Sequence, residues 1–221
     1  MNAHTQIKLN VNNNRLFANL GSVFSDAGIV LRELVQNGRR AGSDSVDISA
    51  CINEETEHLT VSIRDYGKGI DDFQSLLCLA DSSWSEDIVE NEKPFGMGFF
   101  SVFFCCEKVR ISSNNMLLNF DCKHMIEGGT VAPESTENSD ITQGTLIELI
   151  GFNGFQSQGV TLDAQGQFDN VQRTLVMLAK GDETIIRFNY EELDAPSARR
   201  SIQNRVKYNT SFGEVFIMSN L

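Results

Sequence analysis

Glu33 and Asn37 lie four positions apart in AGIVLRELVQNGRRA, a segment whose apolar residues recur at helical spacing from Ala27 to Ala41. This spacing places both side chains on one face of a helix, one turn apart. A side-chain amide oxygen can ligate Mg²⁺, and a carboxylate can orient or deprotonate an attacking water. The pair could therefore act at a phosphate, although a solvated helix face explains such spacing more often.

A second segment, RDYGKGI, places Asp65 where a strand gives way to a loop. Its carboxylate could accept a hydrogen bond from an exocyclic amine, while Gly67 and Gly69 allow the backbone to approach a flat ring closely. A simple turn has the same composition, so the segment is ambiguous alone.

Two further segments could contact a ligand. In PFGMGFFS, Gly96 and Gly98 precede an expected buried helix, whose first N–H groups could hold phosphate oxygens, although glycines also loosen helix starts for structural reasons. The segment lacks the Lys and Ser/Thr of a Walker A loop, and Ser101 stands where a dinucleotide fingerprint has Gly or Ala. In QGTLIELI, Thr145 could donate or accept a hydrogen bond at a strand start.

The elements expected around these segments indicate an α+β protein, because helices and strands are segregated along the chain. Alternating apolar residues predict a hairpin over 45–52 and 58–65, and a short helix lies within DDFQSLLCLA. The polar stretch 81–94 is expected to be a mobile loop, and 124–143 a loop or an extra hairpin. The remaining expected elements are strands in KVRISS, MLLNFDC and GTLIELI, a helix over 169–180, and strands in TIIRFNYEEL and EVFIMSNL.

Taken in order, ELVQNGRRA, DYGKGI, FGMGFFS and GTLIEL resemble the motifs of the GHKL superfamily of ATPases, named after gyrase, heat-shock chaperones, histidine kinases and mismatch-repair proteins. The resemblance spans Leu31 to Ile150, and the third motif is most similar to the ninety-kilodalton heat-shock chaperones. It implies a Bergerat-type fold, a two-layer sandwich of a mixed, mainly antiparallel sheet with helices on one face. We expect residues 1–180 to form the ATP-binding domain, and 181–221 to be a C-terminal segment that could begin a second domain.

The family pattern also implies roles for individual residues. Glu33 would be the general base, Asn37 the Mg²⁺ ligand, and Asp65 the reader of the adenine amino group, helped by Thr145 through water. The other residues implied at the ATP are Ala41 in the first motif, Gly67, Gly69 and Ile70 around the adenine, and Gly96, Met97, Gly98 and Phe99 at the phosphates. The 81–94 loop would be the ATP lid.

The chain departs from the family at two points. Arg40 stands where the first motif usually has Asp. In many relatives a Lys or Arg from a following domain reaches the γ-phosphate, and no residue here is assigned that role. We therefore expect this chain alone to hydrolyse ATP slowly. A homodimer partner or C-terminal domains would complete the functional protein.

Composition narrows the function further. A formal net charge of −12 argues against direct nucleic-acid binding, which draws on clustered Lys and Arg. Five cysteines without a C-x-x-C pair favour reduced thiols and a cytoplasmic location, and no apolar stretch is long enough to suggest a membrane role. Three alternatives remain: an ATP-sensing module without significant hydrolysis, a histidine-kinase catalytic domain, and a dinucleotide-dependent oxidoreductase suggested only by the glycines.

Overall fold

The computed structural model describes residues 20–21, 27–78, 98–136, 141–179 and 184–193, and the backbone of 205–210 and 213–218. The described elements longer than three residues are α2 (Ala27–Arg40), β1 (Ser45–Ile52), β2 (Leu59–Asp65), α3 (Phe73–Leu76), the 3-10 helix η1 (Gly98–Phe104), β3 (Lys108–Ser113), β4 (Met116–Asp121), α5 (Cys122–Ile126), β6 (Thr145–Ile150), α6 (Ala164–Leu178), β9 (Ile185–Phe188), β11 (Arg205–Thr210) and β12 (Gly213–Met218). The two-residue strands are β5 (Glu134–Ser135), β7 (Gln156–Ser157), β8 (Val160–Thr161) and β10 (Glu191–Glu192).

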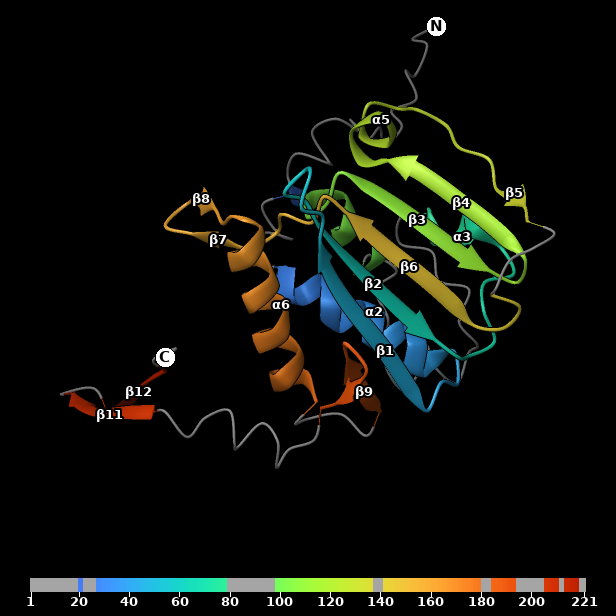
Figure 1. Cartoon of the computed structure of the whole chain (residues 1–221). Helices are drawn as coiled ribbons and strands as arrows, with labels where there is room; N and C mark the ends of the chain where they lie inside the picture. Colours follow the sequence, from blue (N-terminus) through green and yellow to red (C-terminus); the bar gives the residue numbers. More distant parts are fainter. Residues whose placement is uncertain are drawn as a thin grey trace, which may run out of the picture.

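One large sheet forms the centre of the molecule, with strand order β10-β9-β1-β2-β6-β3-β4-β5 (Figure 1). Its neighbouring strands are antiparallel except for β1 and β9, which run parallel. β11 with β12 and β7 with β8 form two separate hairpins. The sheet is therefore mixed and mainly antiparallel, and with helices α2 and α6 packed on it the expected α+β fold class is confirmed.

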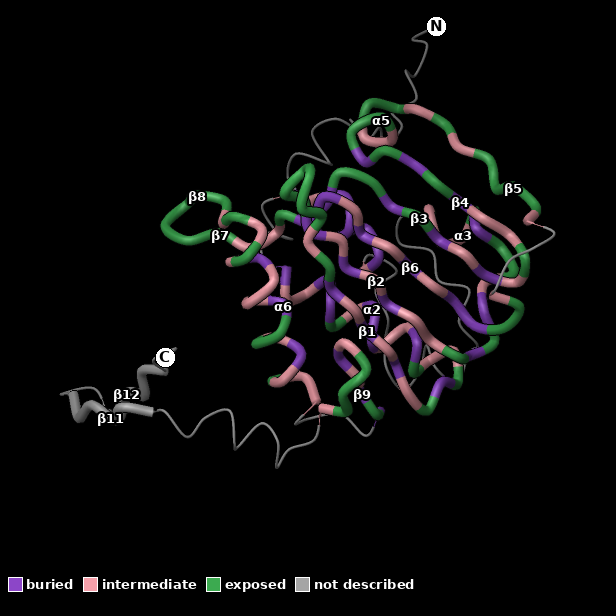
Figure 2. The backbone as a smooth tube through the Cα atoms, viewed as in Figure 1, coloured by how far each residue is buried: buried purple, intermediate pink, exposed green. Residues whose placement is uncertain are grey.

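The core lies between one face of the sheet and the helices. Along most of β1 and β2 and the whole of β6, buried residues alternate with less buried ones, as the period-2 geometry of a strand requires (Figure 2). Helix α2 supplies Val30, Leu31, Leu34 and Val35 to this core, and α6 supplies Val171 and Leu175. Helix α2 packs on β1 and β2, helix α6 packs on β1, β2 and β9, and helix α5 contacts β4.

Several elements differ from their expected bounds. The segment 124–143 is not simply a loop, because α5 begins at Cys122, where the Asp121 side chain accepts from His124 N at 3.0 Å, and β5 then pairs with β4. Helix α6 starts five residues earlier than expected, since Asp163 caps it by accepting from Gly166 N at 2.8 Å.

The predicted strand in TIIRFNYEEL is two strands. Asn189 and Tyr190 have positive φ angles of 47° and 72°, so the chain turns between β9 and β10. Because β9 pairs with β1, the main sheet continues past the division expected after residue 180. A second domain in the rest of the 181–221 segment stays a prediction.

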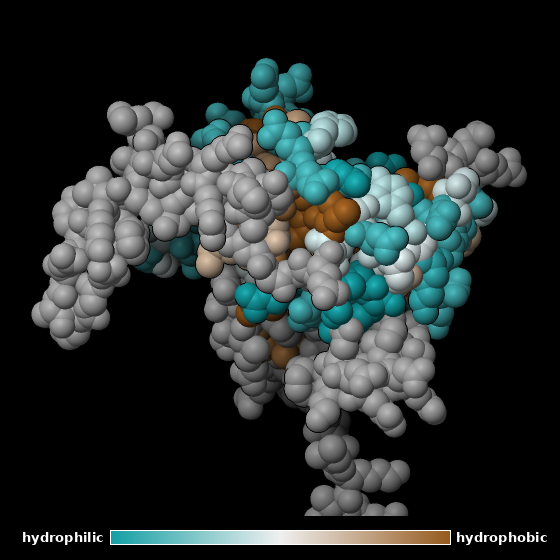
Figure 3. Space-filling model, turned by 90° about the horizontal axis from the view of Figure 1, so that it is seen from below, coloured by the Kyte–Doolittle hydropathy of each residue, from teal (hydrophilic) through white to brown (hydrophobic). Residues whose placement is uncertain are grey.

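Figure 3 shows one face with a small hydrophobic area bordered by hydrophilic side chains. Large hydrophobic side chains that are exposed are scattered, and they are Tyr66, Val160, Met177, Ile185 and Tyr190. Among the described residues, we find no helix with the length and apolar character needed to cross a bilayer.

Candidate nucleotide site

A pocket lies between α2, the ends of β2 and β6, the loop after β2, and the start of η1. Nine of the residues expected to contact the ligand line this pocket. They are Glu33, Asn37, Ala41, Asp65, Gly69, Ile70, Gly98, Phe99 and Thr145. Gly96, Met97 and the proposed 81–94 lid fall outside the described residues. Gly67 is not among the lining residues, and an added Cβ there would lie 2.6 Å from Ala41 Cβ. The roles assigned to Gly67 and to the lining residues stay predictions.

Helix α2 forms one wall of the pocket. Glu33, Asn37 and Ala41 follow one another at four-residue intervals, so they cover about 12 Å along one helix face. The order runs from a carboxylate through an amide to a small apolar side chain beside the Asp65 loop. A nucleoside triphosphate lying along the helix could place its phosphates at Glu33 and its base near Ala41.

At the Glu33 end, the side chain packs directly against the backbone of Gly98. A Cβ at Gly98 would collide with the Glu33 carboxyl group, so only glycine leaves room for this approach. Gly98 opens η1, and the Ser101 hydroxyl donates to its carbonyl oxygen at 2.5 Å. The expected buried helix after the glycines is thus a 3-10 helix, and its glycine start faces the candidate base.

At the other end, Asp65, Thr145 and Ser113 form a row across β2, β6 and β3. The Ser113 hydroxyl, which is fully buried, accepts from Ile70 N at 2.9 Å, donates to Gly144 O at 2.8 Å and lies 3.4 Å from Thr145 Oγ1. Ser113 was not predicted as a site residue. The alternation of KVRISS placed it on the buried face, but only the β3–β6 register brings it beside Thr145.

Burial raises the pKa of Asp65 above its ordinary value of 3.8, while hydrogen bonds from Gly67 and Thr145 and the nearby Arg64 charge partly offset that rise. Gly67 N donates to Asp65 Oδ1 at 2.9 Å. A half-buried carboxylate needs hydrogen-bond donors. The adenine amino group is a donor that Asp65 could accept from.

The pocket is also lined by residues that were not predicted from the sequence, and some of these are apolar. Ile63 and Ile147 each lie two positions from a predicted site residue, on the same strand face, and could therefore have been inferred from the period-2 pattern. Leu34 and Gly38 similarly share the helix face of Glu33 and Asn37. The further unpredicted lining residues are Arg40, Lys68, Asp71, Asp72, Ser75 and Leu76.

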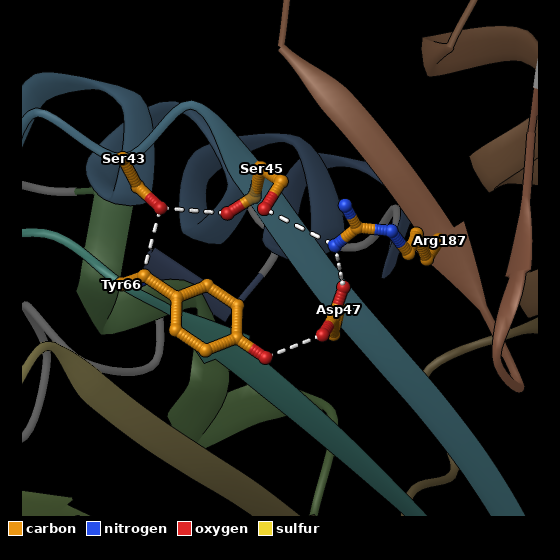
Figure 4. A network of polar contacts seen from close by, with 5 residues as sticks. All are labelled: Ser43, Ser45, Asp47, Tyr66 and Arg187. Carbon is orange, nitrogen blue, oxygen red and sulfur yellow. Dashed lines mark hydrogen bonds and ion pairs between the residues drawn. The ribbon is translucent and has the colours of Figure 1, made fainter.

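A polar network fixes the loop next to Asp65 from the outer side (Figure 4). The Tyr66 hydroxyl donates to Asp47 Oδ2 at 2.5 Å, and Arg187 Nη1 donates to Asp47 Oδ1 at 2.8 Å. Ser43 Oγ accepts from Tyr66 N at 2.9 Å and donates to Ser45 O at 2.6 Å. The network joins β9, β1 and the residue that follows β2, so Arg187 is linked through Asp47 to the loop after Asp65.

The residues present fit a magnesium ion held mainly by nucleotide phosphates. Mg²⁺ in nucleotide sites commonly takes only one or two protein ligands, and Asn37, which lines the pocket, carries a side-chain oxygen of the kind that Mg²⁺ binds. That oxygen accepts from Arg40 Nη1 at 3.1 Å, which uses one of its two lone pairs and leaves the other. Among the described residues, no group of three or more His, Cys, Asp or Glu side chains is placed to hold a metal ion without a bound nucleotide.

Comparison with known proteins agrees with this geometry. Residues 24–125 match the family model described as histidine kinase-, DNA gyrase B-, and HSP90-like ATPase. The match supports the GHKL superfamily and hence ATP binding, and it includes Glu33, Asn37, Asp65 and the Gly98 region. Among curated proteins, no match to the chain is found. A particular likeness to the ninety-kilodalton chaperones stays a prediction.

Proposed function

We propose that this domain binds ATP with Mg²⁺ and hydrolyses it slowly, and that closure over the nucleotide drives a conformational change in a larger protein or a homodimer. The observation that supports the proposal is the convergence of Glu33, Asn37 and Asp65 on one pocket, with Gly98 against the Glu33 carboxyl group. Each group suits a different part of the nucleotide.

Asp65 would accept the adenine amino hydrogen bond, with Thr145 and Ser113 holding the strand ends in register. Ile63 and Ile147 would contact the faces or edge of the base. Asn37 would provide an oxygen to the Mg²⁺, which neutralises phosphate charge when bound. The Glu33 carboxylate would orient and deprotonate water near the phosphates, because its side chain is only 28% exposed and lies beside the Gly98 backbone.

The second candidate is an ATP-sensing module without significant hydrolysis. Arg40 favours it, because Arg40 Nη1 lies 4.0 Å from Glu33 Oε2 and 3.1 Å from Asn37 Oδ1. A carboxylate held by an ion pair with Arg40 is less available to orient an attacking water. The two candidates share the ATP site and differ in turnover.

Glu33→Gln separates the two functions, with Glu54→Gln as a control that makes the same change on an exposed turn. For the ATPase, we expect the wild-type protein to turn over ATP below about 1 s⁻¹, and Glu33→Gln to lose at least about 100-fold of that rate. ATP affinity should change less than about threefold, since the carboxylate acts on water rather than on adenine.

Phosphate release and calorimetry measure the two quantities on the same preparations. Unchanged turnover in Glu33→Gln would exclude Glu33 as the base. ATP binding by the wild-type protein with no turnover above the background measured without protein would favour the sensing module.

A further inference from the structure

Arg40 marks the point where the first motif departs from the family, and the structure turns its side chain into the pocket. The side chain is only 8% exposed, although the neighbouring Arg39 is exposed on the same helix. Arg40 Nη1 donates to Asn37 Oδ1 at 3.1 Å and lies 4.0 Å from Glu33 Oε2. The substituted residue therefore contacts both groups that are expected to work at the phosphates.

The direction of the side chain explains how a residue near the adenine end reaches the phosphate end. Helical side chains lean toward the helix N-terminus, so the guanidinium of Arg40 extends over Asn37 toward Glu33. An Asp at this position would attract a divalent cation at the Asn37 oxygen, whereas an Arg repels it. The planar guanidinium fork also matches the geometry of phosphate oxygens.

We propose that Arg40 is a resident phosphate-binding cation that takes over part of the charge neutralisation by Mg²⁺, so that ATP binding to this chain depends weakly on the metal. The inference rests on the proposed function, because it requires the triphosphate to lie along α2. When ATP enters, the guanidinium exchanges its hydrogen bond to Asn37 and its ion pair with Glu33 for hydrogen bonds to phosphate oxygens. Asn37 Oδ1 then gains a lone pair for the Mg²⁺ that accompanies the nucleotide.

Calorimetric titration with ATP, in excess Mg²⁺ and in EDTA, measures this dependence directly. We expect removal of Mg²⁺ to weaken wild-type binding by less than about tenfold, and to weaken Arg40→Gln binding by at least about 100-fold, because a hydrogen bond to a charged group is lost. Arg40→Asp, which restores the family's residue, should bind ATP only with Mg²⁺. Arg40→Lys, which keeps the charge without the planar fork, should show a Mg²⁺ dependence between those of the wild type and Arg40→Gln.

Two controls separate phosphate binding from a structural role. Arg39→Gln makes the same chemical change one residue away and should leave the Mg²⁺ dependence unchanged. Adenosine, which has no phosphate, should bind the wild type and Arg40→Gln equally, whereas a merely structural Arg40 would weaken adenosine and ATP alike. Arg40→Met keeps the packed stem without the charge and replaces Arg40→Gln should that variant fail to fold.

The outcomes are distinguishable from failure of the proposed function. Equal Mg²⁺ dependence in the wild type and Arg40→Gln, with ATP bound by both in Mg²⁺, would overturn the role of Arg40 alone. Weakened adenosine binding in Arg40→Gln would do the same. Absence of ATP binding by the wild type in Mg²⁺ would overturn the nucleotide site, and Arg40's role with it.

Discussion

Replacement of Asp65 by Asn tests the adenine end of the site, because it should weaken ATP binding and raise the thermal stability of the nucleotide-free protein. Asp65 Oδ1 accepts from Gly67 N at 2.9 Å, and an Asn can keep that bond through its own carbonyl oxygen. The second oxygen, however, becomes an NH₂ group, which cannot accept from the adenine amine. We therefore expect Asp65→Asn to fold and to bind ATP poorly.

The loss of a hydrogen bond between a neutral donor and a carboxylate is worth about 1.5 to 3 kcal/mol, which corresponds to roughly 10- to 150-fold in Kd. Calorimetry with ATP and GTP measures this loss. The preference for ATP over GTP should shrink, because the Asn amide can donate to the guanine carbonyl oxygen. Asp44→Asn, an exposed acid in the α2–β1 connection, is the matched control and should bind ATP like the wild type.

Stability should change in the other direction. Because burial raises the pKa of Asp65 in the folded protein, the folded state holds this proton more tightly than the unfolded chain does. The contribution of Asp65 to stability therefore falls as pH rises from the ordinary value of 3.8 through the raised pKa, and at neutral pH the ionised group destabilises the nucleotide-free fold. Asp65→Asn removes that cost, so its Tm at neutral pH should exceed the wild-type value.

Thermal unfolding as a function of pH measures this difference, which should disappear below the ordinary pKa of an aspartate. Wild-type ATP affinity in Asp65→Asn would refute the assignment of Asp65 to the adenine. A lower Tm in Asp65→Asn at neutral pH would refute the reasoning from burial.

Three other perturbations test separate parts of the structure. Gly98→Ala should reduce phosphate release by at least about tenfold with an unchanged circular dichroism spectrum, because its Cβ would displace the Glu33 carboxyl group; wild-type rates would contradict this packing. Ser113→Ala should lower the free energy of unfolding in urea by about 1 to 3 kcal/mol, because Ile70 N and Gly144 O lose a buried partner, and a neutral effect would show that water replaces the hydroxyl. A chain ending at residue 180 loses the buried side chains of Ile186 and Phe188, worth about 1.5 to 3 kcal/mol each, so it should unfold at lower urea than a chain ending at residue 193; equal midpoints would place β9 outside the domain.

Much of the fold could be predicted from local patterns. The apolar spacing of AGIVLRELVQNGRRA predicts α2 to within one residue, and alternation predicts β1, β2, β3, β4 and β6 closely. Local signals failed where capping or turn geometry decides. The Asp163 cap starts α6 before the expected helix, in a segment that contains Gly166. The positive φ angles of Asn189 and Tyr190 divide the single expected strand into two.

The candidate site could be predicted in part for a similar reason. Spacing on one helix groups Glu33 with Asn37, but no local pattern brings Asp65 opposite Thr145, because that neighbourhood depends on the pairing of β2 with β6. Ser113 joins them only through β3. The inward direction of Arg40 likewise depends on side-chain packing, since a basic residue at the end of a helix is most often solvated.

Titration of the wild-type chain with ATP and NAD in Mg²⁺, compared with Asp65→Asn, tests the central claim most directly. We predict measurable ATP binding by the wild type, at least about tenfold weaker ATP binding by Asp65→Asn, and no comparable binding of NAD. Tight binding of NAD without binding of ATP would contradict the assignment of this pocket to ATP.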